Sequence, residues 1–261
     1  MPKLSLLPTG ARTYVLLGCL LLLLAALPFK QEIRNFASPF VGWIKGRPTV
    51  EQRLMQFGTS ARDRLAPFFK NRNLAYPPSQ LTLLVLKREQ ILEIWVQDPR
   101  GNPVLIKTYP VKSMSGKLGP KLMEGDNQVP EGIYAIESLN PNSTFHVSLR
   151  LNYPNEFDRL QARSEQRNPG GDIMIHGGAV SIGCVAMGDE AAEELFVIAA
   201  DTGLPNIKVI LSPIDFRKQP VLAMPQPPQA AWVGNLYAVI REELSALSLP
   251  DHAGVNRAME R

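Results

Sequence analysis

The sequence predicts a mostly β fold with some α-helix, preceded by an N-terminal membrane segment and followed by a C-terminal helix. Short runs rich in β-branched and aromatic residues recur between residues 81 and 152 and are separated by turn residues, which is typical of strands. The 23 prolines fall mainly in connecting stretches. An apolar content of 45% and a charged content of 20% are ordinary for a globular protein.

The length and charge of the chain indicate how many domains it holds and which partners it binds. A chain of 261 residues can hold one domain of catalytic size with appendages. Its net charge of +4 is spread along the chain without a dense basic block, so we expect no nucleic-acid partner.

The N-terminus has the pattern of an export signal or a membrane anchor. Residues 1–12 are a basic flank, and residues 13–29 carry no charge. A full span needs about 20 apolar residues, whereas the apolar region of a signal peptide holds roughly 7 to 15. No small-x-small cleavage site follows Ala26, which favours an uncleaved anchor. Lys30 and Arg34 follow the segment, so the basic residues alone do not favour export of what comes next.

Residues 30–79 are predicted to form a tether and a short basic helix. The first part contains Pro39 and Gly42, which favour irregular backbone. Thr49 with Gln52 three positions later is the pattern of a capping box, so we expect the helix to begin there.

Residues 80–215 are predicted to form the core domain. The sequence favours a β-hairpin, a third strand, two further strands and a closing strand, over residues 81–87, 90–98, 102–111, 131–137, 144–152 and 206–213. In the stretch 144–152, apolar residues alternate with His146, Ser148, Arg150 and Asn152, so we expect His146 on a solvated polar face beside Arg150.

Helical patterns end the domain and the chain. Asp189 is predicted to cap a helix that stops at Gly203. Residues 216–230 are a proline-rich linker, and residues 231–261 are predicted to form a helix and a tail. The helix spaces its apolar residues as a docked helix does, at Trp232, Leu236, Ile240 and Leu244.

The stretch IMIHGGAVSIGCVAMGD, residues 173–189, places Cys184 eight positions after His176. The other cysteine, Cys19, lies in the apolar N-terminal segment. In an exported domain a single thiol cannot form an internal disulfide, so its retention needs a reason. A small buried hydrophobe is the structural alternative. Gly177 and Gly183 between the two residues favour a tight loop, whose backbone N–H groups could hold an oxyanion.

These residue types point to acyl transfer by a thiolate. An imidazole that accepts the thiol proton activates a cysteine at neutral pH, and His176 is the natural candidate. Ser181 could donate to the oxyanion, orient the loop or make a turn. One histidine and one cysteine are too few for a zinc site, so we expect no metal and no other cofactor.

Two segments carry a family resemblance. HGGAVSIGCVAM resembles the active-site motif of the L,D-transpeptidase catalytic domain, the YkuD-type fold, in which an HG pair is followed by S-x-G-C. EGDNQVPEGIYAI resembles the G-D-x-x-T-P-E-G-x-Y segment of that family, with Val129 in place of the threonine. LNYPNEFDR and the ending CVAM are similar to the YafK-like branch. The resemblance covers roughly residues 80–215.

The resemblance implies a mostly β catalytic domain, export to the cell envelope, and a cysteine nucleophile that acts on the peptide stems of peptidoglycan. Cys184 would be the acylated nucleophile and His176 its base. Gly183 and the Cys184 backbone would shape the oxyanion site, and Ser181 matches the motif serine. Most of the family has an arginine two positions after the cysteine, where this chain has Ala186 followed by Met187. This departure puts the donor preference in question.

Three functions follow from these residues. A transpeptidase would join peptidoglycan stems, or a protein to them, through a thioester on Cys184. An amidase would let water resolve the same thioester and cut a diaminopimelate linkage between peptidoglycan and a protein or peptide. A silent wall-binding module would not need the intact pair of His176 and Cys184. The expected partners are peptidoglycan stem peptides, a wall-linked protein and the membrane, with residues 13–29 anchoring the chain to the inner membrane and the domain on the periplasmic side.

Overall fold

The structure is a computed structural model that describes residues 46–219 and 230–247. The chain divides into two compact units, Met1–Arg47 and Pro48–Arg261, and the fold below is that of the second. The predicted membrane segment, most of the proline-rich linker and the C-terminal tail lie outside the described residues. None of the helices within the described ranges has the length and apolar character that a membrane crossing requires.

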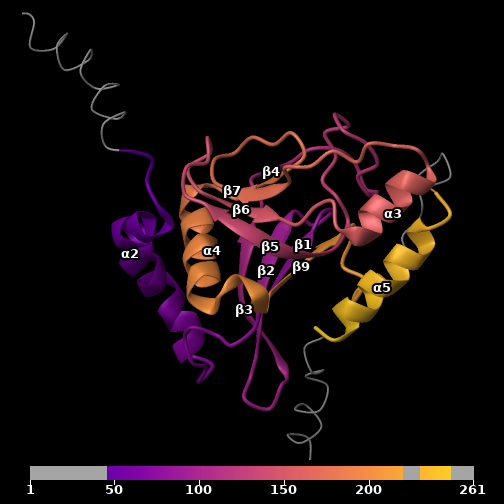
Figure 1. The fold of residues 1–261 in the computed structure, drawn as a ribbon. Helices are drawn as coiled ribbons and strands as arrows, with labels where there is room; N and C mark the ends of the chain where they lie inside the picture. The colour runs from indigo at the N-terminus through magenta and orange to yellow at the C-terminus, as the bar shows by residue number, and fades with distance from the viewer. Residues whose placement is uncertain (1–45, 220–229, 248–261) are drawn as a thin grey trace, which may run out of the picture. The chain divides into compact units, whose positions relative to one another are not determined.

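A sheet of nine strands forms the centre of the described fold, in the order β3-β2-β1-β9-β5-β6-β7-β8-β4 (Figure 1). Its strands are β1 Leu81–Leu86, β2 Ile91–Gln97, β3 Pro103–Pro110, β4 Ser113–Met114, β5 Gly132–Asn140, β6 Ser148–Leu151, β7 Met174–His176, β8 Val185–Ala186 and β9 Ile207–Ser212. Neighbouring strands run antiparallel except for the pairs β1 with β9 and β7 with β8, which are parallel. The prediction of a mostly β fold with α-helix is confirmed.

Both faces of the central strands are covered. In β1, Leu81, Leu83 and Val85 join the core beneath helices α2 Val50–Lys70 and α4 Asp189–Thr202. Leu84 and Leu86 face the other way and join the core beneath α5 Val233–Ser245. A strand buried on both faces reads as a continuous apolar run, which is why the segment LTLLVL shows no alternation.

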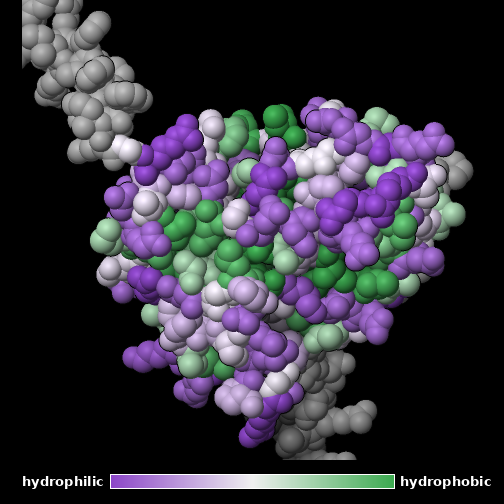
Figure 2. Space-filling view, viewed as in Figure 1, coloured by the Kyte–Doolittle hydropathy of each residue, from purple (hydrophilic) through white to green (hydrophobic). Residues whose placement is uncertain are grey.

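The first and last helices of the described residues lie where the sequence predicts helices. Thr49 and Gln52 form the expected capping box at the start of α2, although this helix is long, with 21 residues. Helix α5 buries Leu236, Ile240 and Leu244 against the sheet. Figure 2 shows apolar residues in a band across this face of the molecule, with hydrophilic residues around it.

Two helix starts differ from the prediction. The cap of α4 is Gly188, and Asp189 is the first helical residue with no capping hydrogen bond. Its carboxylate instead binds the loop after β7, because that loop lies across the helix start. Helix α3, Glu156–Ser164, was not predicted; its Asn155 and Asp158 form a capping box. A short 3₁₀ helix, Leu204–Asn206, precedes β9.

The stretch 144–152 forms a shorter strand than its alternation predicts. Strand β6 begins only at Ser148, and His146 just before it has a φ of +73°. The prediction of a solvated strand face for His146 is wrong, because its imidazole is 22% exposed and contacts Glu193 of α4 at 3.0 Å. A left-handed residue ends the period of two, so Phe145 does not share the face of Val147.

Candidate active site

The parallel pair of β7 and β8 brings His176 and Cys184 together. Ile175 is paired with Val185, and His176 with Ala186, so Cys184 lies one position before β8. Side chains two positions apart on a strand share a face, which puts Cys184 and His176 on the same side of the sheet. Both line one cavity of about 470 Å³. The eight-residue separation in sequence is therefore closed by a loop that connects two adjacent parallel strands.

The rim of this cavity is apolar and amide-rich. Its lining also includes Asn140, Asn142, Phe145, Asp172, Met174, Val180, Ser181 and Ile182. Val180 and Ile182 are 59% and 81% exposed. Figure 2 shows hydrophobic residues at the top of the view, where the loop between β7 and β8 lies in Figure 1. Apolar side chains therefore line the cavity beside Cys184 and His176.

The imidazole of His176 is fixed in one tautomer. Its Nδ1 lies 2.6 Å from the carbonyl oxygen of Gly177, which can only accept a hydrogen bond. Nδ1 therefore carries the proton, and Nε2 has the free lone pair. Burial lowers the pKa of His176, and the bond to Gly177 opposes that shift. The residue is only 3% exposed, and the lowered pKa leaves its imidazole neutral at neutral pH.

The thiol of Cys184 is half-buried and points to a backbone carbonyl. It donates to the oxygen of Asp172 at 3.6 Å, and no hydrogen bond joins it to His176 within the described part of the chain. Burial raises the pKa of Cys184, the Met174 N–H lowers it, the Asp172 charge raises it and Lys121 lowers it. The pair is therefore a neutral thiol beside a neutral imidazole before substrate binds.

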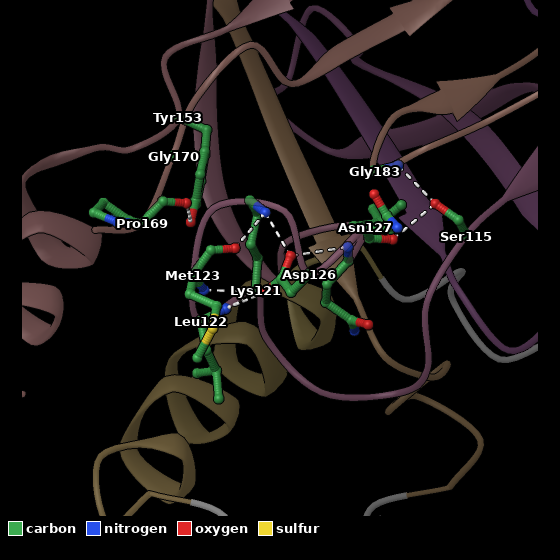
Figure 3. A network of polar contacts seen from close by, with 12 residues as sticks. Ser115, Lys121, Leu122, Met123, Asp126, Asn127, Tyr153, Pro169, Gly170 and Gly183 are labelled. Atoms are coloured by element: carbon green, nitrogen blue, oxygen red, sulfur yellow. Dashed lines mark hydrogen bonds and ion pairs between the residues drawn. The ribbon is translucent and has the colours of Figure 1, made fainter. Parts of the chain in front are cut away.

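Ser181 and Ser115 fix the loop that leads to Cys184. The hydroxyl of Ser181 donates to the carbonyl of Cys184 at 2.6 Å and accepts the N–H of Ser115 at 3.2 Å. The hydroxyl of Ser115 accepts the N–H of Gly183 at 2.6 Å and donates to the carbonyl of Asn127 at 2.8 Å (Figure 3). Of the three roles open for Ser181, its contacts are those of loop orientation.

The second sequence motif forms the turn that supports this loop. The carboxylate of Asp126 accepts the backbone N–H groups of Leu122, Met123 and Gln128 at 2.9 to 3.0 Å and pairs with Lys121 (Figure 3). This turn presents the carbonyl of Asn127 to Ser115. The GDNQVPEG segment thus reaches the nucleophile through Ser115, which the sequence motifs do not include.

The glycines of the loop have their N–H groups occupied by protein acceptors. Gly177 donates to the carbonyl of Val147 at 3.2 Å, and Gly178 to the carboxylate of Asp189 at 2.8 Å. Gly183 donates to Ser115, as described above. Gly177 and Gly183 therefore shape the loop, and in this arrangement neither offers a free donor to an oxyanion.

Ala186 occupies the position at which most of the family has an arginine. It is fully buried and lies between His176 and Ser113 in the sheet. No lysine or arginine lines the described cavity, and Asp172 is its one carboxylate. The cation nearest to this lining in the described contacts is Arg150, which pairs with Asp172.

Sequence reasoning predicted His176, Cys184, Ser181, Gly177 and Gly183 as site residues, and it missed three residues that contact this segment: Ser115, Phe145 and Asp189. Asp189 could have been found as a carboxylate at a helix start whose role was misassigned. Ser115 and Phe145 carry no signal in the sequence, because each acts on residues more than 30 positions away.

About half of this chain is similar in sequence to a known family. Residues 82–210 match the family model described as the L,D-transpeptidase catalytic domain, YkuD. Over 140 residues the chain is 31% identical to the Escherichia coli (strain K12) protein named "Putative L,D-transpeptidase YafK", covering 52% of this chain and 54% of that protein. The chain thus aligns over about half the length of the curated relatives it matches.

Two solved structures are also similar. The helical cell shape determining protein Pgp2 from Campylobacter jejuni is 22% identical with a TM-score of 0.42, over 51% of this chain and 47% of that chain. Bd1075 from Bdellovibrio bacteriovorus is 19% identical with a TM-score of 0.40, over 66% and 56%. Both His176 and Cys184 lie within the segment that matches the family model. Through residues 82–210, the chain belongs to the YkuD family of L,D-transpeptidase catalytic domains.

Proposed function

We propose that this protein is a cysteine acyl-transfer enzyme that acts on the peptide stems of peptidoglycan. The observation that carries the proposal is the placement of Cys184 and His176 in one cavity, with the imidazole tautomer set by Gly177. A base with a free Nε2 beside a thiol is the arrangement that nucleophilic catalysis by cysteine requires. The intact pair also disfavours a silent wall-binding module.

The reaction proceeds in two steps through a thioester. In the first, Nε2 of His176 takes the proton of the thiol as sulfur attacks the carbonyl carbon of a stem-peptide amide. The C–N bond breaks, and the leaving amine takes that proton from His176. In the second, an amine or a water attacks the thioester, His176 removes its proton, and the thiol of Cys184 is restored by the same proton.

The oxyanion of each tetrahedral intermediate needs hydrogen-bond donors. The N–H groups of Gly177, Gly178 and Gly183 already bind protein acceptors. We therefore assign the N–H of Cys184 as the first donor, with the preceding loop shaping its direction. A second donor requires either a substrate-induced shift of the Gly183 bond to Ser115 or a group from the substrate.

The same site supports a second function, an amidase that cuts a diaminopimelate linkage between peptidoglycan and a protein or peptide. The observation that favours it is the absence of a cationic side chain from the described cavity lining. A donor that loses a terminal amino acid carries a carboxylate beside the scissile bond, which a cation would stabilise. A leaving amine on an aliphatic chain suits the apolar rim of Val180 and Ile182 instead. We expect hydrolysis to dominate, with transfer when a suitable amine is abundant.

Product analysis separates these functions. The full chain is incubated with purified donor muropeptides and graded concentrations of a diaminopimelate-containing acceptor, and products are identified by mass spectrometry. Near-complete cross-linking at low acceptor concentration would make the protein a dedicated transpeptidase. A protein-linked muropeptide as substrate tests the amidase directly. The variant Cys184→Ser retains the size of the side chain and should form no product, since loss of a nucleophile costs about 10³- to 10⁶-fold in rate. Turnover by that variant would end the proposal.

The location of the protein is part of the same proposal. Peptidoglycan substrates place the catalytic domain on the periplasmic side of the cell envelope, with residues 13–29 as the anchor to the inner membrane. Fractionation of cells expressing the full chain, followed by protease treatment of spheroplasts, tests both points. Full protection from protease in intact spheroplasts would contradict them.

A further inference from the structure

The segment before β6 contains an uncommon backbone conformation. His146 has a φ of +73°, a left-handed value that few residues other than glycine adopt. Such a residue persists when its surroundings fix it, and it is a pointer to function when it lies near a reactive site. Its two neighbours in sequence diverge: Val147 is fully buried in the core, and Phe145 is 37% exposed at the cavity.

The left-handed conformation of His146 places the ring of Phe145 against the imidazole of His176. The ring centroids of Phe145 and His176 are 4.8 Å apart, with an angle of 26° between the planes, which is a stacked pair. In a regular strand Phe145 would follow Val147 into the core instead. Because His146 is left-handed, the side chain of Phe145 contacts His176 and does not enter the core.

Contacts from two helices hold this arrangement. The Nε2 of His146 lies 3.0 Å from a carboxylate oxygen of Glu193 in α4, and its ring lies 5.7 Å from that of Phe57 in α2. The N–H of Phe145 donates to the hydroxyl of Ser143 at 3.1 Å. Phe145 is thus fixed by the hydrogen bond of its own N–H to Ser143 and by the contacts of its neighbour His146 with α2 and α4.

The loop after His176 is built around the same phenylalanine. A Cβ on Gly178 would lie 3.3 Å from the ring of Phe145, and a Cβ on Gly177 would lie 2.7 Å from its carbonyl oxygen. The two glycines let the loop approach Phe145 closely. The ring is consequently enclosed between the imidazole and the loop on one side and open to the cavity on the other.

We propose that Phe145 is a positioning residue that stacks on His176, holds the plane of its imidazole, and shields one face of the ring from water. The inference rests on the proposed function only in taking His176 as the base. Two constraints then fix the ring: the carbonyl of Gly177 sets the tautomer, and Phe145 sets the plane.

Shielding has a measurable electrostatic consequence. Burial lowers the pKa of His176 below the ordinary 6.5, and the Phe145 ring supplies part of that burial. The titratable groups around the imidazole are the thiol of Cys184 and the carboxylate of Asp172 at the cavity, Asp189 at the start of α4, and the pair of His146 with Glu193 behind Phe145. Removing the phenylalanine ring leaves all of these in place.

Titration of the histidines in the full chain tests the proposal without substrate. The chain has three histidines, so their labelled ring carbons give three NMR signals, which single substitutions assign. The Cys184→Ala background removes the coupled thiol. Phe145→Ala should move the midpoint of His176 upward, toward 6.5, and Phe145→Tyr, which keeps the stacked ring, should leave it in place. An unchanged midpoint in Phe145→Ala would overturn the proposal.

A wall residue of the same cavity provides the control. Ile182→Ala removes an apolar side chain that is 81% exposed and makes no stack with His176. It should leave the midpoint of His176 unchanged; a shift equal to that of Phe145→Ala would show a general effect of the cavity and would also overturn the proposal. Because no turnover is measured, a failure here is distinct from a failure of the proposed function.

The pH profile of the enzyme gives a second readout. With Cys184 restored, each unit of upward shift in the midpoint of His176 leaves tenfold less neutral base at acidic pH. Phe145→Ala should therefore lower kcat/KM several-fold more at pH 6 than at pH 8, whereas Phe145→Tyr should follow the wild-type profile. An equal loss at both pH values would contradict the shielding role.

Discussion

The hydroxyl of Ser115 accepts the backbone N–H of Gly183 at 2.6 Å and thereby ties the residue before the nucleophile to the end of β4. The same hydroxyl donates to the carbonyl of Asn127, and Ser181 closes the set by donating to the carbonyl of Cys184. Three segments far apart in sequence are thus joined beside the reactive thiol. In the proposed mechanism the Cys184 N–H binds the oxyanion, and its direction depends on this junction because it follows Gly183 directly.

Loss of the Ser115 hydroxyl should impair catalysis more than substrate binding. We expect Ser115→Ala to lower kcat by about 10- to 100-fold with little change in KM, since the N–H of Gly183 loses its acceptor and the proposed oxyanion donor that follows it loses its direction. Steady-state kinetics with a muropeptide donor measures both constants. Ser113→Ala, in strand β4 just before Ser115 and outside these hydrogen bonds, is the control. An equal loss in both variants would show that Ser115 has no special role.

The neutral state of the catalytic pair predicts the alkylation behaviour of Cys184. Because burial raises the pKa of the thiol, the rate of its reaction with iodoacetamide should climb about tenfold per pH unit through pH 7 to 9, without a plateau near neutrality. Asp172→Asn should move the climb to lower pH, because the Asp172 charge raises this pKa. Peptide mass spectrometry follows Cys184 separately from Cys19. A plateau below pH 7 would instead indicate a preformed thiolate and imidazolium pair.

Replacing Gly177 with alanine should lower the stability of the fold more than replacing Gly183 with alanine. Gly183 has a φ of +112° but room for a Cβ, with its nearest neighbour at 3.6 Å, so Gly183→Ala should cost only backbone strain, about 1–2 kcal/mol. A Cβ on Gly177 would lie 2.6 Å from the Asp189 carboxylate and 2.7 Å from the Phe145 carbonyl, so Gly177→Ala should cost more.

Urea denaturation of the two variants measures these costs. Gly171→Ala, where a Cβ meets nothing within 4 Å, is the control and should be close to neutral. Equal stability losses for Gly177→Ala and Gly183→Ala would contradict the close approach of the loop to Phe145 and Asp189.

Asp158 should make the stability of the fold fall as pH rises. Burial raises its pKa to about 6, against the opposing effects of the Asn155 N–H and Tyr134. A carboxyl whose pKa is raised from 3.8 contributes stability that is fully present below that value and is lost as pH rises through about 6. Asp158→Asn lacks this loss, so its stability relative to the wild type should increase by about 1.4 kcal/mol between pH 5 and pH 8.

Denaturant titrations of both proteins at the two pH values measure the difference. The asparagine retains an oxygen that can accept the N–H of Asn155, so the capping of α3 is kept. A constant difference between the two proteins across this range would show that Asp158 is ionised in the folded state throughout.

The local patterns of the sequence determined most of the elements and the reactive pair. Strand β1, the hairpin to β2 and the docked helix α5 follow from apolar runs with a period of 2 or 3.6, which depend on near neighbours alone. Cys184 and His176 could be predicted as a pair because a short glycine-containing loop joins them. Residues so close in sequence can lie close in space without contacts from distant segments. The family was recognisable from the same local motifs.

Only the tertiary structure decided which distant residues support that pair. Ser115 reaches Gly183 because β4 pairs with β8, a register that connects residues about 70 positions apart. The alternation before β6 predicted a regular strand, but His146 has a left-handed conformation and contacts α2 and α4, and Phe145 stacks on His176. The hydrophobic periodicity of a segment cannot predict such contacts, because their energy comes from side chains on other helices and strands. The sequence by itself therefore determined the candidate reacting groups, His176 and Cys184, and the fold determined their orientation.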